Sequence, residues 1–156
     1  MKKFGFGPPR APIRSAAELP AGLAATLARQ WVEAAEHAAS AKDGLTAFLR
    51  IHFDFLASAP ETGEILYQGP PDDQSGRFDA SVRDLFKPLL EAVAAQVERG
   101  KRDKAFRPDV DPASAAVHFL GLVQMAFQFW SMKGRSGSLR GIGEELFGQW
   151  LNSISA

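Results

Sequence analysis

The stretch that decides the fold class runs from Asp111 to Lys133 and reads DPASAAVHFLGLVQMAFQFWSMK. Asp111 offers a carboxylate that can cap a helix, and Pro112 suits the first helical position, where a backbone N–H would have no partner. The residues that follow are apolar almost all round, and a helix without a wet face is buried on several sides. We therefore predict that residues 112–133 form a central helix of an all-α protein.

Helical spacing of apolar residues extends to both sides of this stretch. Asp43 and Gly44 interrupt the pattern, Pro60 ends the helix that follows them, and Pro88 is expected to bend a long one. No segment alternates with a period of two, so strands are not expected. The sequence predicts about six helices, over residues 21–38, 44–57, 62–67, 78–100, 112–133 and 138–153, with an exposed loop at 69–76.

The bulk composition is that of an ordinary globular chain. Its 18 basic and 18 acidic residues cancel, which gives no support to nucleic-acid binding as the main activity. The absence of cysteine excludes disulfides and thiolate metal sites, and no apolar run is long enough to span a bilayer. We expect a soluble cytoplasmic protein with no membrane partner.

The chain divides into a short N-terminal segment and one domain. Residues 1–14 contain three prolines, two glycines and four basic residues without an acidic one. This composition rules out a stable helix, and we expect a flexible end. Ser15-Ala-Ala-Glu18 has the form of a capping box, so a helical domain is expected over residues 15–156.

Motifs that carry chemistry are missing from the sequence. No Glu-x-x-His or His-x-x-x-His pair offers the helical spacing of metal ligands. Gly134-Arg-Ser-Gly137 is one residue too short for a nucleophile elbow, and Gly5-Phe-Gly7 precedes prolines rather than a helix that could hold a phosphate. We expect no enzyme activity, no metal and no cofactor.

Several short motifs, in order and spacing, resemble the TetR family of bacterial transcriptional regulators. The main one is Phe106-Arg-Pro-Asp-Val-Asp-Pro112, followed by Leu120-Gly-Leu-Val-Gln124 inside a long apolar helix. The proline in Phe86-Lys-Pro-Leu-Leu90 matches a common family variant, and Ser58-Ala-Pro-Glu61 resembles the family's Asn-Pro-Glu turn. The resemblance covers about residues 15–154 and implies the family's C-terminal regulatory domain.

The N-terminal side departs from the family. Ile13-Arg-Ser-Ala-Ala-Glu-Leu19 is similar to the junction between the family's DNA-reading domain and its regulatory helices, but Ile13 and Ala16 replace an aromatic residue and a lysine. Family members place a three-helix DNA-binding unit before this junction, whereas 14 residues precede Ser15 here. No recognition helix fits within them, so we expect no DNA-reading domain in this chain and only an indirect relation to DNA.

The resemblance implies a ligand pocket on one side of the 112–133 helix. For this pocket we select aromatic, methionine and histidine side chains, which would give an adaptable apolar cavity with a few polar groups. The candidate ligand-binding residues are Phe48, His52, Phe55, Tyr67, Phe86, Leu90, His118, Leu122, Met125 and Phe129. His52 and His118 have an alternative interpretation as hydrogen-bonded core groups.

A partner subunit is implied on the other side of the same helix, since the last two helices form a four-helix dimer bundle in the family. Glycine costs roughly 1 kcal/mol relative to alanine inside a helix, so glycines here suggest that close contact compensates. The candidate interface residues are Gly121, Gln124, Gln128, Ile142, Gly143, Leu146, Phe147 and Trp150.

The sequence thus predicts a homodimeric, effector-sensing domain of a TetR-like regulator that binds a small, largely apolar ligand. Such a ligand would shift the helices and, in an intact regulator, move the DNA readers. The alternative is a helical dimerisation module without a functional pocket, acting for instance in mixed dimers with a full-length relative. A helical enzyme is a third interpretation, which no motif supports.

Overall fold

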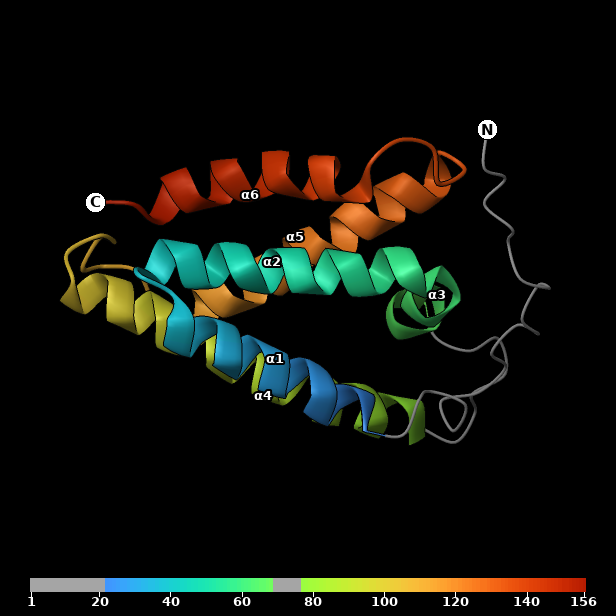
Figure 1. Ribbon diagram of the computed structural model, residues 1–156, viewed down its shortest axis with the longest axis horizontal. Coiled ribbons are helices and arrows are strands. Elements are labelled where there is room, and N and C mark those ends of the chain that lie inside the picture. The colour runs from blue at the N-terminus through green and yellow to red at the C-terminus, as the bar shows by residue number, and fades with distance from the viewer. Residues whose placement is uncertain (1–21, 69–76) are drawn as a thin grey trace.

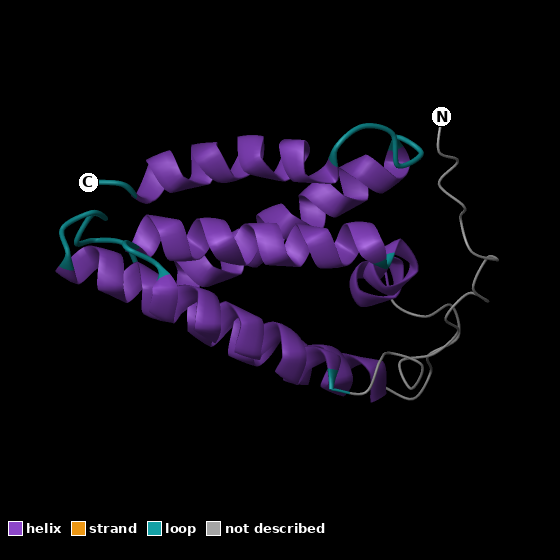
Figure 2. Ribbon diagram, in the orientation of Figure 1, coloured by secondary structure: helices purple, strands orange, loops and turns teal. Residues whose placement is uncertain are grey.

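The computed structural model describes residues 22–68 and 77–156, and this part of the chain contains six α-helices and no strand (Figures 1 and 2). The helices are α1 (Leu23–His37), α2 (Ala41–Ser58), α3 (Pro60–Gln68), α4 (Arg77–Arg102), α5 (Pro112–Met132) and α6 (Leu139–Ile154). The predicted all-α fold is confirmed. The N-terminal segment, the capping box at residues 15–18 and the loop at 69–76 lie outside the described residues.

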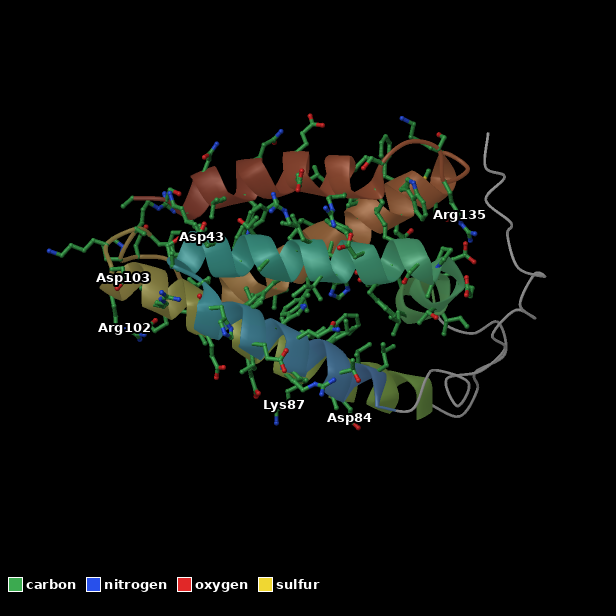
Figure 3. All side chains as sticks on the ribbon, viewed as in Figure 1. Asp43, Asp84, Lys87, Arg102, Asp103 and Arg135 are labelled. Carbon is green, nitrogen blue, oxygen red and sulfur yellow. The ribbon has the colours of Figure 1, made fainter. Side chains whose placement is uncertain are left out.

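Helix α2 lies in the middle of the bundle and contacts each of the other five helices (Figure 1). Helices α1 and α4 run alongside each other on one side of α2, and α6 packs on the other side, with α5 passing behind. Charged side chains such as Asp84, Lys87 and Arg102 lie at the periphery (Figure 3). The core between the helices is filled by fully buried aromatic residues: Trp31, Phe48, Phe53, Phe106, Phe119 and Phe127.

Helix α2 begins earlier than predicted, because Asp43 and Gly44 belong to its first turns and do not interrupt it. Ser40 is the N-cap: its Oγ accepts a hydrogen bond from the Asp43 backbone N–H at 3.1 Å and donates one to the Asp43 carboxylate at 2.7 Å. Gly44 is buried where a side chain would overlap Gln96 of α4. The glycine therefore marks a close helix contact, which composition alone does not distinguish from a break.

The prolines at positions 60, 88 and 112 lie where the sequence places them, except that Pro60 also begins a helix. Pro112 opens α5, and the Asp111 carboxylate accepts a hydrogen bond from the Ser114 backbone N–H at 2.8 Å, as predicted. Pro60 follows the end of α2 but also opens α3. Pro88 lies inside α4, which continues through it.

A pair of backbone hydrogen bonds joins the end of the described chain to the segment between α4 and α5. The N–H of Arg107 donates to the carbonyl of Ile154 at 2.9 Å, and the N–H of Ala156 donates to the carbonyl of Ala105 at 3.1 Å. We call this pairing the C-terminal clip. It holds the last turn of α6 beside the turn that precedes α5.

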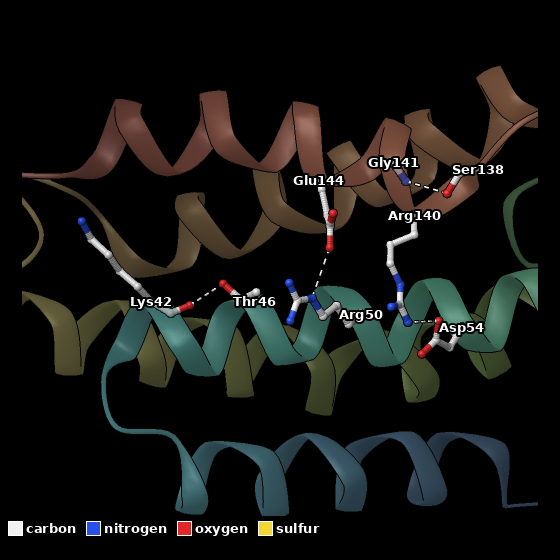
Figure 4. A network of polar contacts seen from close by, with 8 residues as sticks. All are labelled: Lys42, Thr46, Arg50, Asp54, Ser138, Arg140, Gly141 and Glu144. Carbon is white, nitrogen blue, oxygen red and sulfur yellow. Dashed lines mark hydrogen bonds and ion pairs between the residues drawn. The ribbon is translucent and has the colours of Figure 1, made fainter.

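Helices α2 and α6 approach each other closely enough to be linked by ion pairs (Figure 4). Arg50 pairs with Glu144 at 3.2 Å, and Arg140 pairs with Asp54 one turn away. Between them Gly143 faces the ring of Phe53, which occupies the position that a Cβ on residue 143 would take. The lack of a side chain on Gly143 therefore allows α2 and α6 to lie this close together.

Candidate functional site

Helix α5 is buried along one stripe and exposed along the opposite one. Its buried stripe is made by Ala115, Ala116, Phe119, Val123, Ala126, Phe127 and Trp130. The opposite stripe, which we call the outward face of α5, consists of the exposed residues Val117, Gly121, Gln124, Met125 and Met132. The sequence predicts burial of this helix on several sides, and in the single chain its outward face is exposed among the described residues.

Behind α5, the sequence-selected pair His52 and Tyr67 is joined by a hydrogen bond. Nε2 of His52 lies 3.1 Å from the hydroxyl of Tyr67, so the bond ties α2 to α3. His52 is 1% exposed, and its ring meets the edge of the Trp31 indole. Burial lowers the pKa of His52 to about 4 and raises the pKa of Tyr67. Both groups are therefore neutral at pH 7, because a buried site disfavours the charged form.

The second ring nitrogen of His52 is left without a partner. Nδ1 is buried and makes no hydrogen bond within the described part of the chain, and the same holds for Nε1 of Trp31. Buried polar atoms of this kind are costly unless water or a ligand satisfies them. The neighbourhood of His52 therefore has unused hydrogen-bonding capacity inside an aromatic core.

A cavity of about 260 Å³ lies in front of Tyr67 and opens between α4 and α5. Tyr67, Phe86 and Leu90, three of the residues selected from the sequence, form its wall on the α3 and α4 side. The α5 side is formed by Val117, Leu120, Gly121 and Gln124. The Tyr67 ring stacks on that of Phe86, with centroids 6.1 Å apart. Tyr67 thus separates the cavity from the buried imidazole of His52.

The structure does not bring the remaining selected residues to this cavity. Phe48 is fully buried and its ring stacks on that of Trp31. His118, Met125 and Phe129 are exposed, and Leu122 is half-buried against the core. In the single chain these four residues of α5 do not line the cavity, and their assignment to a ligand stays a prediction. The α5 residues that do line the cavity include Gly121 and Gln124, which the sequence assigns to the interface.

The selected interface residues also separate into two groups. Gly121 and Gln124 are exposed, while Gln128, Ile142, Leu146 and Trp150 are half-buried along the edge between α5 and α6. Gly143 and Phe147 are buried inside the chain, with Gly143 against Phe53 and Phe147 against Phe119. Within the subunit the small size of Gly143 and the ring of Phe147 therefore serve internal packing, and a role for them in an interface stays a prediction.

A second depression went unnoticed in the sequence. It is an open groove of about 830 Å³ between α1 and α2, lined by apolar residues such as Leu27, Ile51 and the selected Phe55, with Glu33 and Asp54 at its rim. Its shape depends on the angle between two helices, and the spacing of residues along one helix carries no information about that angle. Both depressions are open to solvent, and the one against Tyr67 is the smaller of the two.

Two further features, a metal-ion site and a membrane-spanning helix, are not found among the described residues. No group of three or more histidine, aspartate or glutamate side chains there is placed to hold a metal ion. Within the same ranges, no helix combines the length and hydropathy that crossing a bilayer requires.

Comparison with known proteins gives a match in fold. No family model and no curated protein matches the sequence. A solved structure of the fatty acid degradation regulator FadR from Bacillus halodurans matches with a TM-score of 0.73 at 15% sequence identity. The match covers 82% of this chain and 66% of that one, so the chain spans about two thirds of the length of the regulator. At this identity the shared property is the helical fold.

Proposed function

We propose that this chain is the effector-sensing and dimerisation domain of a TetR-like transcriptional regulator. The observation that carries the proposal is the cavity walled by Tyr67, Phe86 and Leu90, beside a long helix whose outward face is uncovered. The fold shared with a fatty acid degradation regulator supports the same assignment. The motif around Arg107-Pro-Asp-Val-Asp-Pro112 supports the family.

The expected effector is a small molecule with a largely apolar body. The cavity wall is aromatic and aliphatic, and Tyr67 and Gln124 are the polar groups that line it. Such pockets obtain affinity from apolar burial and orientation from a few polar groups. A carbon chain ending in one polar group fits this distribution, and the neighbour's connection to fatty acid degradation makes a medium-chain fatty acid the first probe to use.

Isothermal titration with decanoic acid tests the pocket. We expect saturable binding at one site per chain, abolished by Leu90→Trp, which fills the cavity from α4. Phe55→Trp is the matched control, since it adds the same side chain to the groove between α1 and α2. Binding that survives Leu90→Trp and disappears in Phe55→Trp would move the effector site to the groove.

The expected partner is a second copy of the chain, bound through the outward face of α5. Among the described residues, four of the five exposed large hydrophobic side chains lie on this helix: Val117, Met125, Phe129 and Met132. Exposed apolar side chains concentrated on one helix are typical of an interaction site. The fifth, Val32, lies on α1 and provides a matched control.

Sedimentation velocity tests this interface. Met125→Glu should dissociate the dimer because each copy would place a charge in the interface, while Val32→Glu should leave the mass unchanged. A monomer at every concentration would contradict the homodimer. Mixed dimers with a longer relative, detected by co-purification, would favour the dimerisation module that lacks a functional pocket.

A further inference from the structure

The residues that form the mouth of the cavity also belong to the outward face of α5. Val117, Gly121 and Gln124 line the cavity, yet Val117 is 59% exposed and the other two are exposed as well. A Cβ placed on Gly121 meets nothing within 4 Å in the single chain. The lining residues on the α3 and α4 side are half-buried, whereas three of the four on α5 are exposed, so the cavity is more open at α5.

The composition of α5 favours a second copy as the molecule that covers this opening. None of its 21 residues is Asp, Glu, Lys or Arg, although its outward face is exposed. In a two-fold dimer a residue near the symmetry axis meets its own copy, so any charge there faces a like charge. A partner recognised by charge gains nothing from α5, whereas an identical helix meets it without repulsion.

Two helical glycines also favour a second copy of the chain as the molecule that covers the opening. Gly121 on α5 and Gly148 on α6 have open space around the position of a side chain, so packing within the subunit does not require glycine at either site. Each costs roughly 1 kcal/mol of helix stability relative to alanine. Gly143, by contrast, is required by Phe53 of its own chain. Gly121 and Gly148 lie on the two helices that the proposed dimer would bury.

We propose that the effector pocket is completed by the partner subunit, so that effector binding and dimerisation strengthen each other. This inference rests on the proposed function and concerns the regulation of the same site. The outward face of α5 from the second copy closes the cavity over Val117 and Gly121, which removes the exposed side of a bound apolar ligand from water. By thermodynamic linkage, the factor by which dimerisation tightens effector binding equals the factor by which effector tightens dimerisation.

The experiment measures both sides of this linkage with the full chain and decanoic acid as the probe. Sedimentation velocity over a dilution series gives the dimer Kd with and without saturating decanoate. Titration at protein concentrations below and above that Kd gives the affinity of monomer and dimer for decanoate. We expect decanoate to lower the dimer Kd by roughly tenfold or more, a coupling of ordinary size, and the two factors to agree.

Three variants separate the pocket from the interface. Leu90→Trp fills the cavity from α4, so the dimer Kd without ligand should be unchanged while its response to decanoate is lost. Gly148→Leu lies away from the cavity and should weaken dimerisation while the monomer keeps its affinity for decanoate. Gly121→Leu should weaken both. Circular dichroism confirms folding of each variant, and Val117→Ser replaces Gly121→Leu if that variant does not fold.

The outcomes distinguish this inference from the proposed function. A stable dimer that binds decanoate with the same affinity as the monomer overturns the shared pocket and leaves the proposed function standing. A chain that neither dimerises nor binds decanoate overturns both. A dimer Kd that still responds to decanoate in Leu90→Trp also overturns the shared pocket, because the coupling would then arise elsewhere.

Discussion

The hydroxyl of Tyr67 lies 3.1 Å from Nε2 of His52, and this bond joins the only tyrosine of the chain to its most deeply buried histidine. Tyr67 faces the cavity on one side and His52 on the other. A ligand that moved Tyr67 would therefore also disturb its hydrogen bond to His52 in the core.

Removing the hydroxyl with Tyr67→Phe should destabilise the fold by about 1–3 kcal/mol, because it leaves both ring nitrogens of His52 buried without a partner. Urea unfolding at one fixed protein concentration measures the change. Ser136→Ala is the control, since it removes an exposed hydroxyl bond to the carbonyl of Lys133 and should shift stability by less than about 0.5 kcal/mol. An unchanged midpoint for Tyr67→Phe would show that the bond contributes no stability.

The stability of the protein should fall in mild acid because of His52. Its pKa is lowered from 6.5 to about 4 by burial. Between these pH values the unfolded chain binds a proton that the folded chain does not, so stability rises with pH through this window and is lost as pH falls through it. The contribution amounts to at most about 3 kcal/mol. Denaturant titrations at pH 4.5 and 7 should show a smaller pH dependence in His52→Gln than in the parent, whereas His118→Gln, at an exposed site, should behave like the parent.

The contact between α2 and α6 should be intolerant of a side chain at position 143. Gly143→Ala places a methyl group where the ring of Phe53 lies, and overpacking of this kind costs about 1–3 kcal/mol. Phe53→Leu in the same chain should recover part of the loss, which a double-mutant cycle detects as coupling. Gly141→Ala is the control, because its Cβ would make ordinary contacts with Ser138 at 3.5 Å. Equal effects of the two alanine variants would refute the close approach.

The ion pairs between α2 and α6 should contribute little stability despite their regular arrangement. The side chains of Arg50 and Glu144 are 54% and 42% exposed, and exposed pairs couple by about 0.2–1 kcal/mol. A double-mutant cycle with Arg50→Gln and Glu144→Gln should give a value in this range that shrinks as salt is added. A coupling several times larger and insensitive to salt would mean that the pair is shielded from water.

The local parts of the fold could be predicted because their causes lie close together in the sequence. The carboxylate of Asp111 and the ring of Pro112 are adjacent, so the start of α5 follows from two residues. Ser40 and Asp43 form an equally local cap, but the glycine beside them was interpreted as a break. Its reason is Gln96, 52 residues away, and no local pattern contains that contact.

The candidate site was predictable only in part, for a related reason. Tyr67, Phe86 and Leu90, three of the residues selected for a pocket, line the cavity. Helix α5 is apolar nearly all round, so its pattern does not say which face turns into the core of the single chain. The rotation is fixed by Phe119, Val123 and Phe127 fitting the core, which is a property of the packed bundle.

The C-terminal clip has a mechanical consequence. Helix α6 is fastened at its far end by the backbone bonds of Arg107 and Ala156, and near its beginning by the pairing of Arg140 with Asp54. The side chains of Arg140 and Asp54 are exposed, and an exposed ion pair contributes little. The backbone bonds of the clip are therefore the firmer attachment, and we expect α6 to separate from the bundle first at its Arg140 end.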